Sequence, residues 1–379
     1  MQVIWPLSIF GFSIPVYKYH WSHRRLHAMF DFLHLSYQYL HWRPPSGPPA
    51  PAPHGTTRTF ISTLKGDLEI LCAKPVNPAP GIPPVVFTHG GMGSAWVWHE
   101  YMRYLADHGI TSYAISARGH GASWYPSFLR MLYTTTKREL ADDFVAGIRA
   151  VQAWEGREVV LVGHSSGGGL SQFILSEGDV RVKGLALLGA IPGSGSLSVY
   201  MNWWLLDPWF TIRTMLHGWH SNSPLSHPFL IKQVFFGKDY PEDKLSEFQS
   251  HMNHYESFFW PLGMMFRFVD PKNVLRNITD WGAGNNRVLI MAGMEEKLMT
   301  RPIQEKAAET YRTAFSELIR DTNLEAQDDA IHALPGEGGM DNAGHGVELA
   351  WVPGAGHHLQ NDTTWKIGAE KLLVFLRRL

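Results

Sequence analysis

The sequence has little of several features on which whole classes of protein depend. Cys72 is the only cysteine, which excludes an intramolecular disulfide and a zinc site built from several thiolates. An excess of one charge is also missing, because 33 Lys and Arg stand against 34 Asp and Glu. A near-neutral chain lacks the basic surface typical of nucleic-acid-binding proteins, so we expect no nucleic-acid partner.

A clear transmembrane or secretory signal is missing at the start of the chain. Residues 1–17 carry no charge, but they are interrupted by Pro6, Gly11 and Pro15 and are shorter than the roughly 20 apolar residues of a spanning helix. They also lack the basic region and the cleavage site of a secretory peptide. Residues 22–40 then place apolar side chains at helical spacing, which predicts an amphipathic helix.

We interpret residues 1–42 as an N-terminal arm. It either packs on the main domain or makes peripheral contact with a membrane through residues 1–40, and a cleaved targeting segment is the third alternative. The Pro-rich run at residues 43–56 predicts a semi-rigid linker. The expected location is intracellular, with membrane association left open.

Beyond the linker, short apolar runs alternate with helical patterns. This alternation predicts an α/β fold with a mostly parallel central sheet and helices on both faces, built from residues 57–194 and 284–379. Residues 195–283 are rich in Trp, Phe and Met, show no clear strand, and predict an inserted helical cap. The polar, Gly-rich stretch 321–346 predicts a mobile surface loop. Strands are predicted at 59–62, 68–73, 84–88, 111–116, 158–162, 182–188, 287–291 and 347–352, and helices at 95–108, 137–154, from 168 and from 364.

One glycine-rich turn carries the strongest chemical signal. The apolar run at 158–162 leads directly into Gly-His-Ser-Ser-Gly at 163–167, a G-x-S-x-G motif placed between a strand and a helix. A serine at such a sharp turn exposes its hydroxyl at the end of the sheet, and flanking glycines avoid collisions with neighbouring backbone. This context predicts that Ser165 is a nucleophile.

A serine nucleophile needs a base, and the base needs a carboxylate that orients it. The strand at 287–291 is followed by Glu295 and Glu296, and the strand at 347–352 is followed by His357 and His358. The carboxyl ends of parallel strands meet at one edge of a sheet, so these side chains are candidates for the acid and the base. The chain order Ser, acid, His is the one associated with this elbow.

Four separated parts of the chain carry recognisable motifs: HGGMGSAW at 89–96, SARGHGAS at 116–123, GHSSG at 163–167, and AGMEEKL at 292–298 together with GAGHH at 354–358. With these motifs, residues 57–379 resemble the α/β-hydrolase superfamily. The resemblance implies the α/β-hydrolase fold, with Glu296 as acid and His357 as base, and keeps Glu295 and His358 as alternatives. The chain departs from the family pattern by having Glu rather than the commoner Asp at the acid, and Ser116 where Asp is usual.

The resemblance also implies an oxyanion hole and a reaction. The oxyanion donors are the backbone N–H groups of Ser166 and Gly91, with Met92 as an alternative. We expect a serine hydrolase of the esterase and lipase type that cleaves an ester or thioester of a small lipophilic substrate through an acyl-enzyme, without a cofactor or metal. Acyl transfer or carbon–carbon bond hydrolysis by the same triad, and a receptor-like protein with little turnover, are the alternatives.

Overall fold

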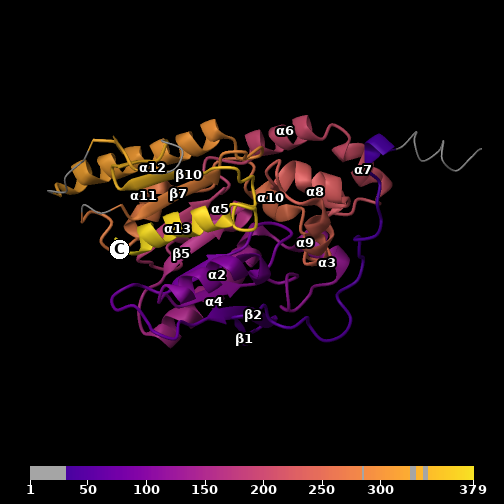
Figure 1. Ribbon diagram of the computed structural model, residues 1–379, viewed down its shortest axis with the longest axis horizontal. Coiled ribbons are helices and arrows are strands. Elements are labelled where there is room, and N and C mark those ends of the chain that lie inside the picture. The colour runs from indigo at the N-terminus through magenta and orange to yellow at the C-terminus, as the bar shows by residue number, and fades with distance from the viewer. Residues whose placement is uncertain (1–30, 284–285, 325–329, 336–339) are drawn as a thin grey trace, which may run out of the picture.

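The computed structural model describes residues 31–283, 286–324, 330–335 and 340–379. In this part of the chain ten strands form one sheet in the order β1-β2-β4-β3-β5-β6-β7-β10-β9-β8 (Figure 1). The strands are β1 Thr57–Thr63, β2 Gly66–Ala73, β3 Val85–Thr88, β4 Ser112–Ile115, β5 Val160–His164, β6 Gly184–Leu188, β7 Val288–Gly293, β8 His332–Ala333, β9 Asn342–Gly344 and β10 Val347–Val352.

The middle of the sheet is parallel. Strands β4, β3, β5, β6, β7 and β10 all pair in parallel, whereas β1 and β2 on one side and β9 and β8 on the other pair antiparallel. Every residue of β3, β5, β6 and β7 is buried, as expected for strands covered by helices on both faces. The predicted fold class is therefore confirmed.

Helices cover both faces of this sheet. Helices α2 and α13 bury Tyr101, Leu105 and Phe375 in a core on one face. Helices α4, α5 and α12 bury Phe144, Ile174 and other side chains in a core on the opposite face, which continues under the cap. The bounds are α2 His99–Asp107, α4 Lys137–Glu155, α5 Ser165–Ser176, α12 Arg301–Thr322 and α13 Trp365–Leu376.

The chain between β6 and β7 forms the cap. Its described elements are all helical, and in Figure 1 α6 to α10 lie together to the right of the sheet, whereas α11 lies at the left beside α12. They are α6 Leu197–Leu206, α7 Phe210–Leu216, η3 Ser223–Leu225, α8 Pro228–Phe235, η4 Glu242–Lys244, α9 Leu245–Ser250, α10 Phe259–Gly263 and α11 Pro271–Arg276. The remaining helical elements are η1 Asp31–Leu33, η2 Ala95–Trp98 and α3 Phe128–Thr134.

The helix predicted for residues 22–40 is wrong in its described part. Only η1 is helical there, and His34 has a positive φ of 46°, which ends a helix. The segment instead follows the cap: the Tyr37 hydroxyl donates to the Leu216 carbonyl at 2.9 Å, and Arg213 Nε donates to the Leu33 carbonyl at 3.1 Å. Tertiary contacts therefore outweigh the local helical periodicity. Residues 1–30 lie outside the described residues.

Smaller differences concern a loop and several boundaries. The stretch 321–346 was expected to be a mobile loop, but its described parts include β8 and β9, which extend the sheet beyond β10. Helix α5 begins at Ser165 rather than near 168, and β6 begins at Gly184 rather than at 182. Among the described residues, no helix has both the length and the apolar character required to cross a bilayer.

Candidate active site

Ser165 occupies the sharp turn between β5 and α5. Its φ of 52° lies in the left-handed region, which a residue other than glycine adopts only when its surroundings enforce it. A Cβ at Gly167 would lie 2.2 Å from the His89 carbonyl oxygen, and one at Gly163 would lie 2.6 Å from the Gly168 Cα. Glycine is required at both positions because the backbone of β3 and of α5 approaches so closely.

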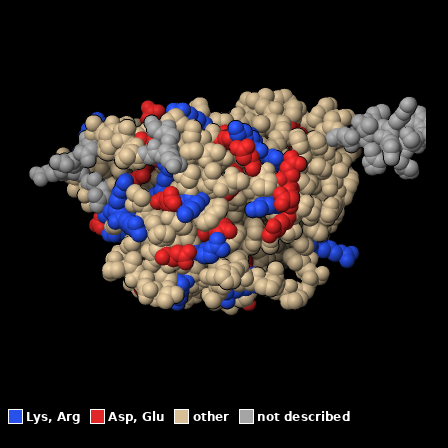
Figure 2. All heavy atoms as spheres, in the orientation of Figure 1, with Lys and Arg blue, Asp and Glu red and all other residues tan. Residues whose placement is uncertain are grey.

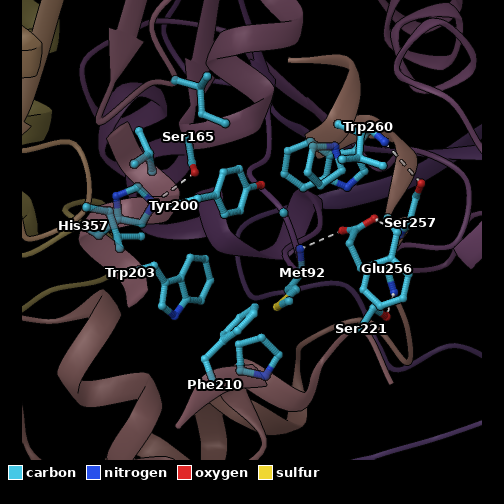
Figure 3. Close-up of a pocket in the computed structure, with 18 of the residues that line it drawn as sticks. Met92, Ser165, Tyr200, Trp203, Phe210, Ser221, Glu256, Ser257, Trp260 and His357 are labelled. Atoms are coloured by element: carbon cyan, nitrogen blue, oxygen red, sulfur yellow. Dashed lines mark hydrogen bonds between the residues drawn. The ribbon is translucent and has the colours of Figure 1, made fainter. Parts of the chain in front are cut away.

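The structure brings Ser165, His357 and Glu296 together. The Ser165 hydroxyl donates to His357 Nε2 at 3.0 Å, and His357 Nδ1 donates to Glu296 Oε2 at 2.7 Å (Figure 3 shows the first of these bonds). The histidine is 2% exposed and the glutamate 8%, so both interactions are shielded from water. A proton can pass from the hydroxyl to the imidazole while the carboxylate holds the ring.

The Glu296 carboxylate is itself fixed by backbone groups. Its Oε1 accepts from the N–H of Leu298 at 2.7 Å and of Met299 at 3.2 Å, which leaves Oε2 for His357. Gly189, just after β6, has a positive φ of 48°, and a Cβ there would lie 3.2 Å from Glu296 Oε2. Gly189 therefore leaves space for the carboxylate. Three donors orient it: the N–H groups of Leu298 and Met299, and His357 Nδ1.

The alternative acid and base lie elsewhere. Glu295 Oε2 accepts from the Lys238 N–H at 2.7 Å, so this carboxylate binds a cap loop instead of a histidine. His358 Nδ1 bonds to Asn361 at 3.0 Å, and its ring packs against Phe235. Burial, with a smaller effect of His357, lowers the pKa of His358 to about 3. Neither residue bonds to the serine.

The loop after β3 lies beside the nucleophile. A Cβ at Gly90 would lie 2.8 Å from the Ser165 Cβ, and one at Gly91 would lie 3.7 Å from the Ser166 hydroxyl and 2.9 Å from the Trp260 ring. Gly90 thus lies directly against Ser165, and Gly91 lies between Trp260 and the residue that follows the serine. The N–H of Met92, the alternative oxyanion donor, instead donates to Glu256 Oε2 at 2.9 Å (Figure 3).

Glu256 is a buried cap residue that sequence reasoning missed. Its Oε2 accepts from Met92 and from His120 Nε2 at 2.9 Å, and its Oε1 accepts from the Ser257 N–H at 2.8 Å. The second nitrogen of His120 donates to the Arg118 carbonyl at 2.8 Å. Both ring nitrogens of His120 face acceptors, so this ring carries two protons and forms an ion pair with the glutamate.

The electrostatics of this pair agree with its hydrogen bonds. Burial is the largest effect on the pKa of His120 and lowers it, but the Glu256 carboxylate, the Arg118 carbonyl and Asp143 together leave that pKa raised. Burial likewise raises the pKa of Glu256, yet His120 and the backbone donors leave it lowered overall. The adjacent His89 is neutral, because burial and His120 lower its pKa to about 3. No local sequence motif marks Glu256, since its partners Met92 and His120 lie more than 130 positions away in the chain.

A cavity of about 410 Å³ opens over Ser165 and His357, within the size range of small-molecule sites. Its cap wall is mostly aromatic and aliphatic, with Tyr200 placed beside the serine in Figure 3. The cap residues that line it include Trp203, Phe210, Trp219, Phe258, Trp260 and Leu262. The oxygens of Glu256, the one carboxylate in this lining, are already bound as described above. The cavity therefore suits an apolar group.

A metal-binding cluster is not seen in the part of the chain that the structure describes. There, His, Cys, Asp and Glu do not gather in a group of three or more that could hold an ion.

Residues 85–364 match the sequence profile of a family described as the alpha/beta hydrolase family. This match covers β3 to the start of the last helix and therefore includes the elbow, Glu296, His357 and the cap. A non-heme chloroperoxidase from Streptomyces lividans is 34% identical over 118 residues, which are 31% of this chain and 39% of that protein. The matched region is therefore much shorter than two thirds of this relative's length.

Solved structures share the fold at low sequence identity. An esterase from Exiguobacterium antarcticum superposes with a TM-score of 0.54 and 18% identity, covering 85% of this chain and 100% of that one. A 2-hydroxy-6-oxo-6-phenylhexa-2,4-dienoate hydrolase from a Rhodococcus strain gives a TM-score of 0.55 and 18% identity, with 85% and 99% covered. At this level of identity the likeness extends to the fold alone.

Proposed function

Because this chain belongs to the alpha/beta hydrolase family, we propose that it is a serine hydrolase that cleaves an ester or thioester of a lipophilic substrate. The observation that carries the proposal is the continuous hydrogen-bonded series from the Ser165 hydroxyl through His357 to Glu296. In this proposal the serine attacks the acyl carbon, and His357 accepts its proton and returns it to the leaving group.

The other roles follow from position. Glu296 holds the His357 ring in the tautomer that accepts at Nε2, and it stabilises the imidazolium that forms during attack. The N–H groups of Gly91 and Ser166 donate hydrogen bonds that stabilise the negative charge on the substrate oxygen. Water then attacks the acyl-enzyme with His357 as base, which releases the acid and restores the serine.

The cavity supports a lipophilic acyl or alcohol group. Its wall offers aromatic and aliphatic contacts, and its volume of about 410 Å³ is that of a small-molecule site. A sugar or phosphate would leave polar groups without partners at this wall, at a cost comparable to lost hydrogen bonds. The fold is shared with a solved esterase, which is consistent with ester cleavage.

Labelling with a fluorophosphonate tests the proposal. The wild-type protein should react, mass spectrometry should place the label on Ser165, and the Ser165→Ala protein should not be labelled although its circular dichroism is unchanged. Unchanged labelling of Ser165→Ala, or a label on a different serine, would exclude this nucleophile.

Product analysis then separates hydrolysis from the alternative reactions. With an ester substrate and an added alcohol, a hydrolase releases mainly the free acid, whereas an acyltransferase makes the new ester. Cleavage of a diketone would indicate carbon–carbon bond hydrolysis. Labelling without turnover on any substrate class would favour a receptor-like protein.

A further inference from the structure

The outer side of the first two cap helices is an exposed apolar surface. We call it the cap face and define it by the exposed large apolar side chains of α6 and α7: Leu197, Met201, Trp204, Leu205, Ile212, Met215 and Leu216. Each of them is between 45% and 66% exposed. Scattered exposed apolar residues are ordinary, but so many on two adjacent helices mark an interaction surface.

The cap face carries no charge. Between Lys183 and Lys232 the chain has only two charged residues, Asp207 and Arg213. Both are buried and bind each other through three hydrogen bonds of 2.5 to 2.9 Å. Figure 2 shows charged atoms over the middle of the view but none where α7 lies in Figure 1. The helices thus neutralise their only charges internally and present an uncharged exterior.

Helices α6 and α7 carry large apolar side chains on both sides, and their exposed polar residues, Ser198 and Thr211, are small. Tyr200 and Trp203 of α6 and Phe210 of α7 line the cavity, while the residues of the cap face point away from it. A surface helix of a water-soluble domain is normally polar on its outer side. A helix that is apolar all round belongs in a protein core or in contact with lipid, and the outer side of these two helices is not covered by the described residues.

The cavity reaches the surface next to the cap face. Trp219 follows α7 and Leu262 lies on α10, and both of them line the cavity although they are 51% and 58% exposed. The opening is therefore bordered by apolar side chains. An apolar substrate could pass from a lipid phase across this border without crossing a charged surface.

The N-terminal segment is fixed beside the same face. The ring of Phe32 lies 4.7 Å from that of Trp209, and Figure 1 shows this segment next to α7. Upstream of it, residues 1–17 contain no charged residue, and Lys18, Arg24 and Arg25 follow. The sequence that precedes Phe32 thus combines an uncharged run with basic residues, a combination typical of interfacial segments.

We propose that the cap face docks on the surface of a phospholipid bilayer, with the active-site cavity opening toward the lipid. Trp and aliphatic side chains without charge suit the interfacial region of a bilayer, where an indole keeps its N–H in contact with polar headgroups. A second protein copy fits the surface less well, because specific protein interfaces surround their apolar centre with a polar, hydrogen-bonding rim. The idea that the bilayer supplies the substrate rests on the proposed function. The docking of the cap face on the bilayer does not depend on that function.

Sedimentation with phospholipid vesicles tests the docking. The whole 379-residue chain carrying Ser165→Ala should be used, since this variant separates binding from turnover. It should bind vesicles of phosphatidylcholine mixed with phosphatidylserine, and adding Trp204→Glu and Met215→Glu should lower its partition at least about tenfold. The matched control is Leu64→Glu with Val76→Glu, which adds the same charges at exposed apolar residues outside the cap and should leave binding unchanged.

Activity and oligomeric state complete the test. In an otherwise wild-type protein, the two cap-face substitutions should leave hydrolysis of a soluble short-chain ester unchanged, since neither residue lines the cavity. No vesicle binding by the full chain would overturn the proposal. So would binding that persists in the cap-face variant but is lost on deleting residues 1–30, or a cap face that instead mediates a dimer in solution.

Discussion

The core wall of the active-site cavity carries Ser165 and His357 where strands end, with Glu296 bonded to His357 beneath the wall. The cap wall carries aromatic and aliphatic side chains on short helices. On the core side the reacting atoms lie 2.7 and 3.0 Å from their partners, held by backbone in contact with the buried sheet. An ion pair between Glu256 of the cap and His120 lies against the loop that follows β3, because Glu256 also accepts from the Met92 N–H.

This difference separates chemistry from substrate choice. A parallel sheet fixes the ends of its strands relative to one another, so groups placed there keep their spacing within tenths of an ångström. Helices of the cap line the cavity with side chains that can change without disturbing that spacing. Substitutions in the core wall should therefore lower turnover by orders of magnitude, and those in the cap wall should have smaller and more selective effects.

The largest effect is expected at His357. His357→Gln removes the base, so kcat for ester hydrolysis should fall by about 10⁴–10⁶. The neighbouring His358→Gln should stay within about tenfold of wild type, because this ring bonds to Asn361 and not to the serine. Steady-state kinetics of both purified variants makes the comparison. Equal losses in the two variants would show that the base has been misassigned.

The next largest effect is expected at the acid. Glu296→Gln keeps the shape of the side chain but not its charge, so the imidazole loses its orientation and kcat should fall by about 10⁴. Glu295→Gln is the matched control, and it should retain nearly full activity because its carboxylate binds the Lys238 N–H. If the Glu295 variant suffered the greater loss, the roles of the two carboxylates would have to be exchanged.

The core wall could be predicted because its signals are local or follow from strand order. The motif around Ser165 predicts a strained turn. Glu296 and His357 follow buried strands whose apolar runs are visible in the sequence. The choice between adjacent candidates was implied by family resemblance alone. Which side chain faces the serine depends on backbone details such as the two N–H groups that hold Glu296.

The cap wall could not be predicted in the same way. Aromatic composition predicted a cap, but the positions of its short helices depend on packing between distant parts of the chain. Glu256 binds Met92 and His120, and no spacing in the sequence connects these three residues. The described part of the N-terminal arm could not be predicted for the same reason. Its periodicity suggests a helix, but its contacts with Arg213 and Leu216 favour a different conformation.

Glu256 is expected to act as a positioning residue for the loop that carries Gly91. Glu256→Gln replaces the carboxylate by an amide that cannot pair with a doubly protonated His120, and the loop should shift. We expect kcat to fall roughly tenfold with little change in KM, less than the about 10²–10³ lost with an oxyanion donor. Glu242→Gln, at an exposed carboxylate of the cap, should change neither constant.

The pH dependence of stability gives a second readout for this pair. His120 has a raised pKa, so its contribution is complete below its unfolded value of about 6.5 and is lost as pH rises through the folded value. Glu256 has a lowered pKa, so its contribution is lost only as pH falls below its ordinary value of 4.5. The Tm difference between wild type and Glu256→Gln should therefore be largest at about pH 5–6.5 and shrink at higher pH. A difference independent of pH would argue against an ion pair.

The smallest effect is expected at Trp203 and concerns selectivity. This side chain lines the cavity and lies 6.2 Å from the Phe210 ring, whereas its neighbour Trp204 points outward and is 55% exposed. Trp203→Ala removes wall contacts, so KM for a long-chain ester should rise about 3- to 10-fold, while kcat for a short-chain ester changes little. Trp204→Ala should leave both values unchanged with soluble substrates. Equal effects on short and long esters would mean that Trp203 supports the fold of the cap and not the binding of the acyl chain.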